Sequence, residues 1–176
     1  MDIETGFASS GIGIADFPVP IVFWYVVIIL FGLALGSFLN VCIYRLPKNL
    51  SVVKPRSFCP ACEEMIRWYD NIPVFSYLFL TGKCRHCSAR IPLRYPIVEA
   101  VTAILFLATF LRDGFHIIWL FDLFFMAAMI VLIFTDIDHQ ILPNEITYTG
   151  IVLGLLSSLF RDELTFLESL IAAVLG

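Results

Sequence analysis

The chain alternates between long apolar stretches and short polar joints. The first apolar stretch, 21–39, holds 19 residues without a charge. At about 1.5 Å of rise per residue, a helix of this length nearly spans the roughly 30 Å hydrocarbon layer of a bilayer. The residues before it contain no Lys or Arg, whereas the first part of a cleavable secretory signal is basic. We therefore predict an N-terminal tail at 1–20 and a retained first transmembrane helix at 21–43.

Further apolar stretches follow a polar region at 44–94. They cover 95–111, 115–135 and 141–160, with another beginning at Leu164, and polar joints at 112–114 and 161–163 separate them. The last stretch reaches Gly176 after 13 residues, short of the roughly 20 that a transmembrane helix needs. We expect 95–176 to form the transmembrane helices of one domain, and we expect this domain to be incomplete at its C-terminal end.

Composition supports the same fold class. Of the 176 residues, 60% are hydrophobic and 15% are charged, and the mean hydropathy is +0.91. Ordinary soluble domains are about 45–50% apolar and about 25% charged. These values argue against a conventional water-soluble enzyme, a disordered tail or an arm that binds nucleic acid. We predict an all-α polytopic membrane protein whose partners include the lipid bilayer and no nucleic acid.

The basic residues indicate how the chain is oriented in the membrane. Nine of the eleven Lys and Arg residues lie between Arg45 and Arg94, and only Arg112 and Arg161 lie elsewhere. Short loops rich in Lys and Arg remain on the cytosolic side of a membrane. The polar region between the first and second spans is therefore predicted to be cytosolic, with the N-terminal tail outside.

Two Cys-x-x-Cys pairs lie in this polar region, with 21 residues between them. They are Cys59 with Cys62 and Cys84 with Cys87. Two such pairs can supply four thiolates to a tetrahedral zinc ion at about 2.3 Å. Two disulfides are the alternative, but disulfides need an oxidising compartment, and the cytosol is reducing. We predict a zinc-ribbon-like loop whose four cysteines hold a structural zinc that does no chemistry.

Two other residues of metal-binding type are not expected to be ligands. His86 lies inside the second pair, where the two flanking sulfurs compete with it, and we expect a solvated side chain. Cys42 lies near the end of the first span, and we expect a small buried hydrophobic residue there.

Carboxylates within or beside transmembrane spans are candidates for function, because they are costly to keep in lipid. The candidates are Glu99, Asp122, Asp136, Asp138, Glu145 and Glu168. Asp136 and Asp138 close the third span, but residues two apart on a helix point about 200° apart and cannot face each other. Two readings stay open for this pair, solvation of a helix end or catalysis by one carboxylate with a partner from another segment. For Asp122 we favour a polar contact between helices.

Several motifs, read in order, resemble the type IV prepilin peptidases, bifunctional enzymes of bacterial inner membranes. The motifs are 36–47 (GSFLNVCIYRLP), the two cysteine pairs with 68–77 (WYDNIPVFSY) and Gly82-Lys83 between them, Arg94-Tyr95-Pro96 with Glu99, and 136–144 (DIDHQILPN). The resemblance implies an aspartyl protease at the cytosolic membrane face. It would remove the basic leader of prepilins or pseudopilins after a glycine and then methylate the new N-terminus with S-adenosylmethionine. It also implies that Asp136, seven residues before Pro143, is the first catalytic aspartate, with Asp138 as the fallback.

The sequence departs from this family in two places. The second catalytic aspartate of the family lies in a Gly-x-Gly-Asp motif on a later helix, and the chain ends before any such motif. Asn144 stands where the family usually has an acid after the proline. We expect the 176-residue form to be unable to cleave by itself. A non-catalytic, zinc-braced scaffold of a pilus or type II secretion machine, and methyl transfer without proteolysis, are the alternatives.

Overall fold

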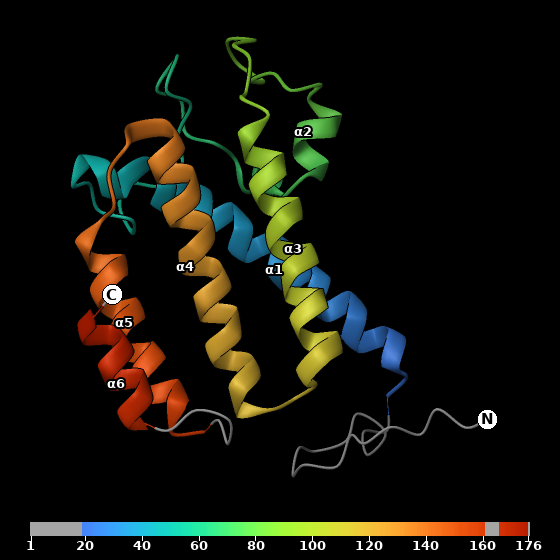
Figure 1. Cartoon of the computed structure of the whole chain (residues 1–176). Helices are drawn as coiled ribbons and strands as arrows, with labels where there is room; N and C mark the ends of the chain where they lie inside the picture. Colours follow the sequence, from blue (N-terminus) through green and yellow to red (C-terminus); the bar gives the residue numbers. More distant parts are fainter. Residues whose placement is uncertain (1–18, 161–165, 176) are drawn as a thin grey trace.

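The computed structural model describes residues 19–160 and 166–175, and within them the chain is helical (Figure 1). The helices are α1 (Ile21–Arg45), η2 (Leu46–Lys48), η3 (Trp68–Asn71), α2 (Phe75–Phe79), α3 (Arg94–Asp113), α4 (Ile117–His139), α5 (Asn144–Ser158) and α6 (Phe166–Leu175). The described residues form no strand, only two isolated antiparallel bridges in the loop between α1 and α3. The all-α prediction is confirmed. The tail at 1–18, the joint at 161–163 and Leu164 lie outside the described residues.

Three of these helices are long and apolar enough to cross a membrane. They are the continuous stretch Ile21–Lys48, Arg94–Asp113 and Ile117–His139. Large apolar side chains on them, including Val22, Ile104 and Leu120, are more than half exposed. A soluble protein rarely presents so much apolar surface to water, whereas lipid-facing helices require it. The polytopic membrane fold predicted from the sequence is therefore confirmed.

The stretch expected to span the membrane at 141–160 is shorter than predicted. α5 has 15 residues, about 22 Å of helix, which is less than the hydrocarbon layer of a bilayer. Gln140 has a left-handed backbone (φ 53°) that ends α4. Pro143 is extended (φ −62°, ψ 123°) immediately before α5. The apolar pattern did not reveal the break between α4 and α5, because Ile141 and Leu142 are hydrophobic although they are not helical.

α1 packs most extensively against α3, at two glycines one turn apart. An added Cβ at Gly32 would lie 2.6 Å from the Cα of Ala103. An added Cβ at Gly36 would lie 2.7 Å from the Cα of Glu99. Small residues at this spacing let two transmembrane backbones approach closely. One turn further along, the side-chain amide of Asn40 donates to the carbonyl of Tyr95 at 3.0 Å.

Two apolar clusters hold α1, α3 and α4 together, one toward each end. The cluster nearer the loop includes Leu39, Cys42, Ile43, Val98 and Val131. Cys42 is buried there, as predicted. The other cluster is rich in aromatic residues and includes Phe106, Phe110 and Trp119, with Phe115 packed against it. The ring centroids of Phe110, Phe115 and Trp119 lie 4.9–5.8 Å apart.

Ion pairs of Arg112 stabilise the joint between α3 and α4. Arg112 pairs with Asp113 and also with the buried Asp122 on α4. A buried carboxylate needs such a partner, because an unpaired charge away from water is costly. The predicted polar contact between helices at Asp122 is confirmed.

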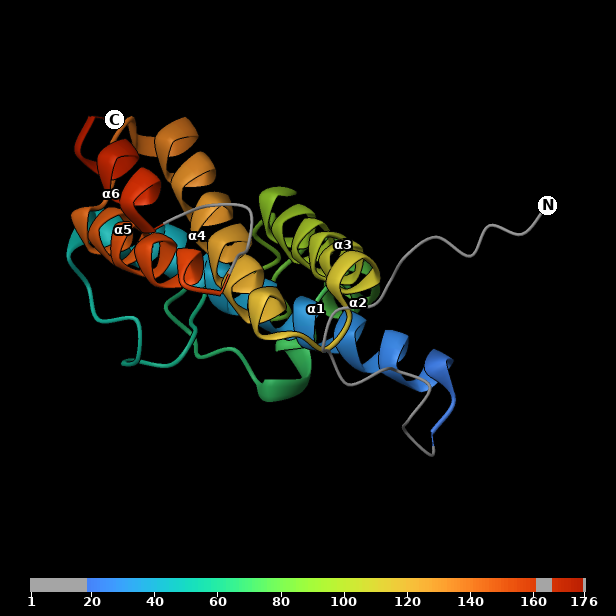
Figure 2. The same ribbon diagram turned by 60° about the horizontal axis from the view of Figure 1, so that its bottom comes forward.

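The cysteine loop and the end of α4 lie at the same end of the helices (Figure 1), and the turned view shows them on opposite sides of α1 (Figure 2). α1 crosses obliquely behind α3 and α4, and the loop leaves the end of α1 and returns at the start of α3. The joint from α4 to α5 also lies at this end. Both candidate sites of the sequence analysis therefore belong to one face of the molecule.

We expect Gly36→Ala to lower the free energy of unfolding by about 1–3 kcal/mol, as overpacking does in well-packed interiors. The added methyl group meets a backbone atom of Glu99, which cannot turn aside. Gly150→Ala is the matched control, because nothing lies within 4 Å of its added Cβ. It should be neutral or stabilising by up to about 1 kcal/mol. Thermal unfolding in detergent, followed by circular dichroism, measures both, and equal melting temperatures would contradict the close approach.

Candidate functional site

The four cysteines of the loop come together as the sequence predicts. Their Sγ atoms all lie within 4.8 Å of one another, and those of Cys59 and Cys87 are 3.9 Å apart. A tetrahedral ion with metal–sulfur bonds of about 2.3 Å needs sulfurs about 3.8 Å apart. The cluster therefore has the geometry of a four-thiolate metal site. His86 is exposed and is not part of it, as predicted.

The two cysteine pairs reach this arrangement through matching turns. In the first, the backbone N–H of Glu63 donates to the carbonyl of Cys59 at 2.8 Å, and in the second Ser88 donates to Cys84 at 3.0 Å. Glu63 and Ser88 each follow the second cysteine of their pair, and both have a left-handed backbone (φ 58° and 57°). Each turn is closed by an antiparallel bridge, in the second case between Lys83 and Arg90. Each turn directs both of its sulfurs toward one point.

The thiols of the cluster differ in acidity. The backbone N–H groups of Cys87 and His86 donate to the sulfur of Cys84 and lower its pKa to about 6. At Cys62 the backbone N–H of Glu64 acts in the same direction, but burial and the neighbouring thiols outweigh it and raise the pKa to about 12. These contacts favour the thiolate form of Cys84, and a bound dication would favour loss of the thiol protons from the cluster.

An ion pair connects the second cysteine turn to the helix η3. The Arg85 guanidinium donates to both carboxylate oxygens of Asp70, with an Nη2–Oδ1 distance of 2.6 Å and an Nε–Oδ2 distance of 2.9 Å. This two-point contact holds the pKa of Asp70 below its usual value. A planar two-point contact also fixes direction, so it orients the turn relative to η3.

The two aspartates at the end of α4 have different surroundings. The helix continues unbroken through both residues to His139, so the carboxylates point to different sides, as the spacing predicts. Asp138 forms an ion pair with Arg94, the first residue of α3. Asp136 is exposed, and its side chain makes no hydrogen bond or ion pair with the part of the chain that the structure describes. Asp138 is therefore held in an ion pair, whereas the carboxylate of Asp136 is open to solvent.

The backbone around Asp136 is fixed by the end of the helix. The N–H of Gln140 donates to the carbonyl of Asp136 at 2.8 Å, with Gln140 in the left-handed conformation typical of a helix C-terminus. Pro143 then precedes α5 and accepts hydrogen bonds from its first turn. Asp136 consequently projects from the last turn of a rigid helix.

Glu99 is not part of the Asp136–Asp138 pair, and it connects the loop to the helices. It is buried on α3, and its Oε2 accepts the backbone N–H of Val74 at 2.7 Å. Val74 has a φ of 60°, which is unusual for a β-branched residue and must be held in place by its surroundings. The sequence analysis named Glu99 as a candidate carboxylate and as part of a family motif, but it did not predict this contact. Val74 is 25 residues from Glu99 in the sequence, and no local sequence pattern predicts the hydrogen bond between them.

Comparison with known proteins places both halves of the chain in one family. Residues 30–112 match the Bacterial Peptidase A24 N-terminal domain, and residues 123–176 match the Type IV leader peptidase family. The chain is 35% identical over 159 residues to a prepilin leader peptidase/N-methyltransferase of Klebsiella pneumoniae, covering 87% of this chain and 70% of that protein. The chain belongs to the type IV leader peptidase family.

Other members of the leader peptidase family are also similar. A prepilin leader peptidase/N-methyltransferase of Myxococcus xanthus is 40% identical over 145 residues, and one of Legionella pneumophila is 38% identical over 159 residues. The alignments cover 82% and 77% of this chain but only 43% and 55% of those relatives. The chain thus spans about half the length of these two proteins. No solved structure matches.

Two motif residues of this leader peptidase family chain have roles that the sequence analysis did not assign. Asn40 is buried and connects α1 to the start of α3 through Tyr95. Arg45 is buried at the end of α1 and donates to the carbonyls of Ser51 and Pro55, each at 2.8 Å. A polar residue in an otherwise apolar helix was the available signal for both.

We expect Glu99→Ala to loosen the loop around Val74, because the partly buried N–H of Val74 loses its acceptor. Limited chymotrypsin digestion in detergent should cleave between Phe75 and Phe79 faster than in the unaltered protein. Glu99→Gln should be affected less, since its amide oxygen can still accept. Glu145→Ala, which removes an exposed carboxylate from α5, is the control and should leave the cleavage rate unchanged. Equal rates for Glu99→Ala and Glu145→Ala would exclude the tethering role.

Proposed function

We propose that the protein is a membrane aspartyl endopeptidase. It removes the leader of type IV prepilins or pseudopilins and then methylates the new N-terminus. Family membership supports the class of reaction, since the relatives are named prepilin leader peptidase/N-methyltransferase. The observation that carries the proposal for this chain is the open carboxylate of Asp136 at the loop end of α4.

Asp136 is a better catalytic candidate than Asp138 on physical grounds. A carboxylate that activates water must have an oxygen free to accept its proton. Asp138 is engaged by the Arg94 guanidinium, which occupies its Oδ2 oxygen. Asp136 has no such competitor among the described residues. We assign catalysis to Asp136 and assign Asp138 a role in holding α4 against α3.

The proposed reaction needs a second carboxylate. In an aspartyl protease the ionised carboxylate takes a proton from water while the protonated partner polarises the carbonyl of the scissile bond. No acid among the described residues contacts Asp136. We propose that the Gly-x-Gly-Asp motif of the family supplies the partner, as the resemblance implies.

The depth of Asp136 suits a substrate with an apolar helix and a basic leader. Such a substrate leaves its leader in the cytosol, so the bond between leader and helix lies where lipid meets water. Asp136 occupies the last turn of a 23-residue span, which is that level. We propose that the loop end faces the cytosol at the bacterial inner membrane, supported by nine basic residues between 45 and 94.

We propose that zinc occupies the cysteine cluster and braces the loop. Cys59, Cys62, Cys84 and Cys87 would be its ligands, and four thiolates leave no open position for chemistry.

The methyl donor is not assigned to the cysteine cluster. Bound S-adenosylmethionine would supply the methyl group, but the described cavity beside α1, of about 240 Å³, is smaller than the roughly 300–1,000 Å³ of sites for drug-sized ligands. Methylation therefore rests on family likeness, and no residue is assigned to it.

Asp136→Asn in the gene product, expressed in its native membrane, should lower the rate of leader removal at least about a hundredfold, because the amide cannot take a proton from water. Processing of a prepilin, followed by the loss of its leader on gels, measures this rate. Asp138→Asn should cost less than about tenfold, since it weakens only an ion pair that water partly screens. Asp113→Asn, at the other end of α3, should have no effect.

The outcome also separates the enzyme from its alternative. If Asp136→Asn left leader removal at its normal rate while Asp138→Asn abolished it, the assignment between the two residues would be reversed. If neither substitution changed the rate, the non-catalytic scaffold would be the better reading of the chain.

The purified protein should contain one zinc ion per chain, and Cys84→Ser should lower the zinc content to near zero. Element analysis by mass spectrometry measures it. Cys42→Ala removes a cysteine that lies outside the cluster and should leave the zinc content unchanged. Chelation should also speed tryptic cleavage of residues 44–94, because metal binding and loop folding are coupled. A loop equally resistant with and without chelator would show that the cysteines do not brace it.

A further inference from the structure

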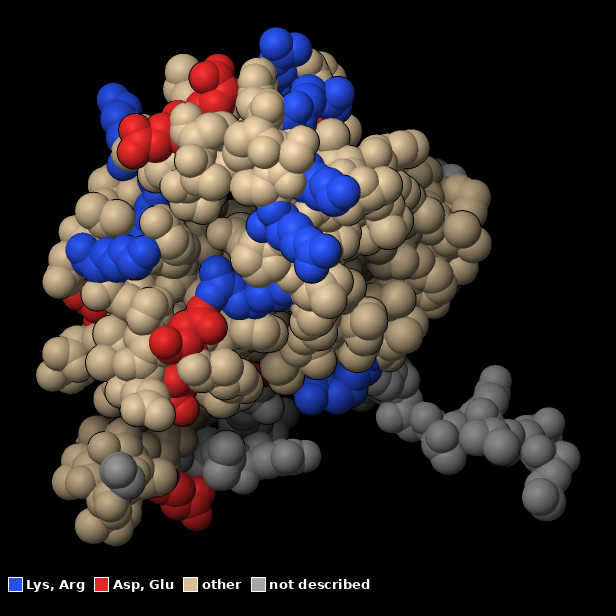
Figure 3. All heavy atoms as spheres, turned by 90° about the horizontal axis from the view of Figure 1, so that it is seen from above, with Lys and Arg blue, Asp and Glu red and all other residues tan. Residues whose placement is uncertain are grey.

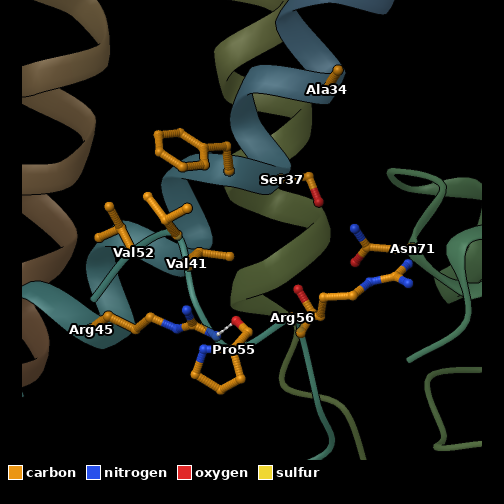
Figure 4. A pocket seen from close by; sticks show the side chains of 11 residues that line it. Ala34, Ser37, Val41, Arg45, Val52, Pro55, Arg56 and Asn71 are labelled. Carbon is orange, nitrogen blue, oxygen red and sulfur yellow. Dashed lines mark hydrogen bonds between the residues drawn. The ribbon is translucent and has the colours of Figure 1, made fainter. Parts of the chain in front are cut away.

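A cavity lies between the last turns of α1 and the segment that follows it (Figure 4). Its volume is about 240 Å³, and its walls are of two kinds. The apolar wall is formed by Ala34, Phe38, Val41, Val52 and Val53. The polar wall is formed by Ser37, Arg45, Arg56, Ser57 and Asn71, and Pro55 completes the lining.

The polar wall carries positive charge without a counterion. Arg45 is 95% buried, since only 5% of its surface is exposed, yet its two hydrogen-bond acceptors are neutral carbonyls. Arg56 forms no ion pair with any acid that the structure describes. The segment 45–57 contains four Lys and Arg residues and no Asp or Glu. A buried cation is normally paired, so the cavity favours an anion.

The cavity also lies at the depth of lipid headgroups. Arg45 is the last residue of α1, about 36 Å along the helix from Ile21. Arg45 lies where the apolar residues of α1 end and the polar segment 46–57 begins, and such a change from apolar to polar residues marks the boundary between hydrocarbon and headgroups. Three of the five residues of the apolar wall belong to α1, and one of them, Phe38, is exposed. An anion with an attached acyl chain would therefore meet charge at one end and apolar surface along the other.

We propose that this cavity binds the phosphate of an anionic phospholipid, with Arg56 beside Asn71 donating to the headgroup (Figure 4). The buried charge of Arg45, which points toward Pro55, adds to the positive potential there, and an acyl chain lies along Ala34, Phe38 and Val41. Arg side chains suit phosphate, because their planar forks donate to two oxygens at once. Basic pockets at the cytosolic ends of transmembrane helices are suited to anionic headgroups. Other Lys and Arg side chains spread over the same end of the molecule, which would draw anionic lipids to it (Figure 3).

The test compares lipids on the intact chain in detergent by native mass spectrometry. Phosphatidylglycerol should bind one site more tightly than phosphatidylcholine, whose choline group is repelled by the arginines. Arg56→Gln should weaken phosphatidylglycerol binding roughly tenfold, and Arg56→Lys, which keeps the charge, should weaken it less. Arg45 is left unchanged, because it also holds the carbonyls of Ser51 and Pro55.

Lys54→Gln is the matched control, since it removes one exposed cation from the same segment but does not line the cavity. The affinity of the Lys54→Gln protein for phosphatidylglycerol should change less than about twofold, as expected for a screened surface charge. Equal losses for Arg56→Gln and Lys54→Gln, or no loss in either, would overturn the site. Glycerol 3-phosphate and inorganic phosphate form the soluble arm. If either displaced the lipid at equal affinity, the site would be one for soluble phosphate and the lipid assignment would be wrong.

Discussion

The close approach of α1 and α3 determines where everything else lies. The two helices meet at Gly32 and Gly36, where side chains larger than hydrogen would push their backbones apart. The loop starts at the end of one helix and returns at the start of the other, so this contact brings the ends of the loop together. Closing a long loop costs chain entropy, and the packed helices have already met part of that cost before the cysteines meet. Asn40 and Glu99 add polar contacts from the same helix pair to the loop side.

The bilayer explains why these contacts are polar as well as apolar. Within lipid the hydrophobic effect does not drive one helix against another, so packing and hydrogen bonds must do so. Asn40 and Asp122 each lie among apolar residues of a long helix, and each contacts a partner on another element. The two lie toward opposite ends of the bundle. Specific polar contacts thus fix the relative positions of the helices at both ends, while the apolar clusters fill the space between them.

Much of this architecture could be predicted from the sequence because its signals are local. Apolar length predicted the spans, and the spacing of the cysteine pairs predicted their cluster. The separation of Asp136 from Asp138 followed from helix geometry alone. The features that could not be predicted are contacts between residues far apart in the sequence. Examples are the hydrogen bond from Val74 to Glu99 and the ion pair between Asp138 and Arg94. The length of α5 was misjudged for another reason, because hydropathy does not register the break at Gln140 and Pro143.

Charge at the loop end of the molecule is divided between two places. The segment 45–57 carries four cations and no acid, whereas the joint 136–145 carries three acids and no Lys or Arg. One of those acids, Asp138, is neutralised by Arg94, which leaves Asp136 and Glu145 to set the local field. On the proposed function, a basic leader is attracted to this acidic joint and repelled by the loop, so it is directed toward the carboxylate that would act on it. Anionic headgroups experience the opposite forces and gather beside α1, so lipid and substrate would occupy different parts of the same face without competing.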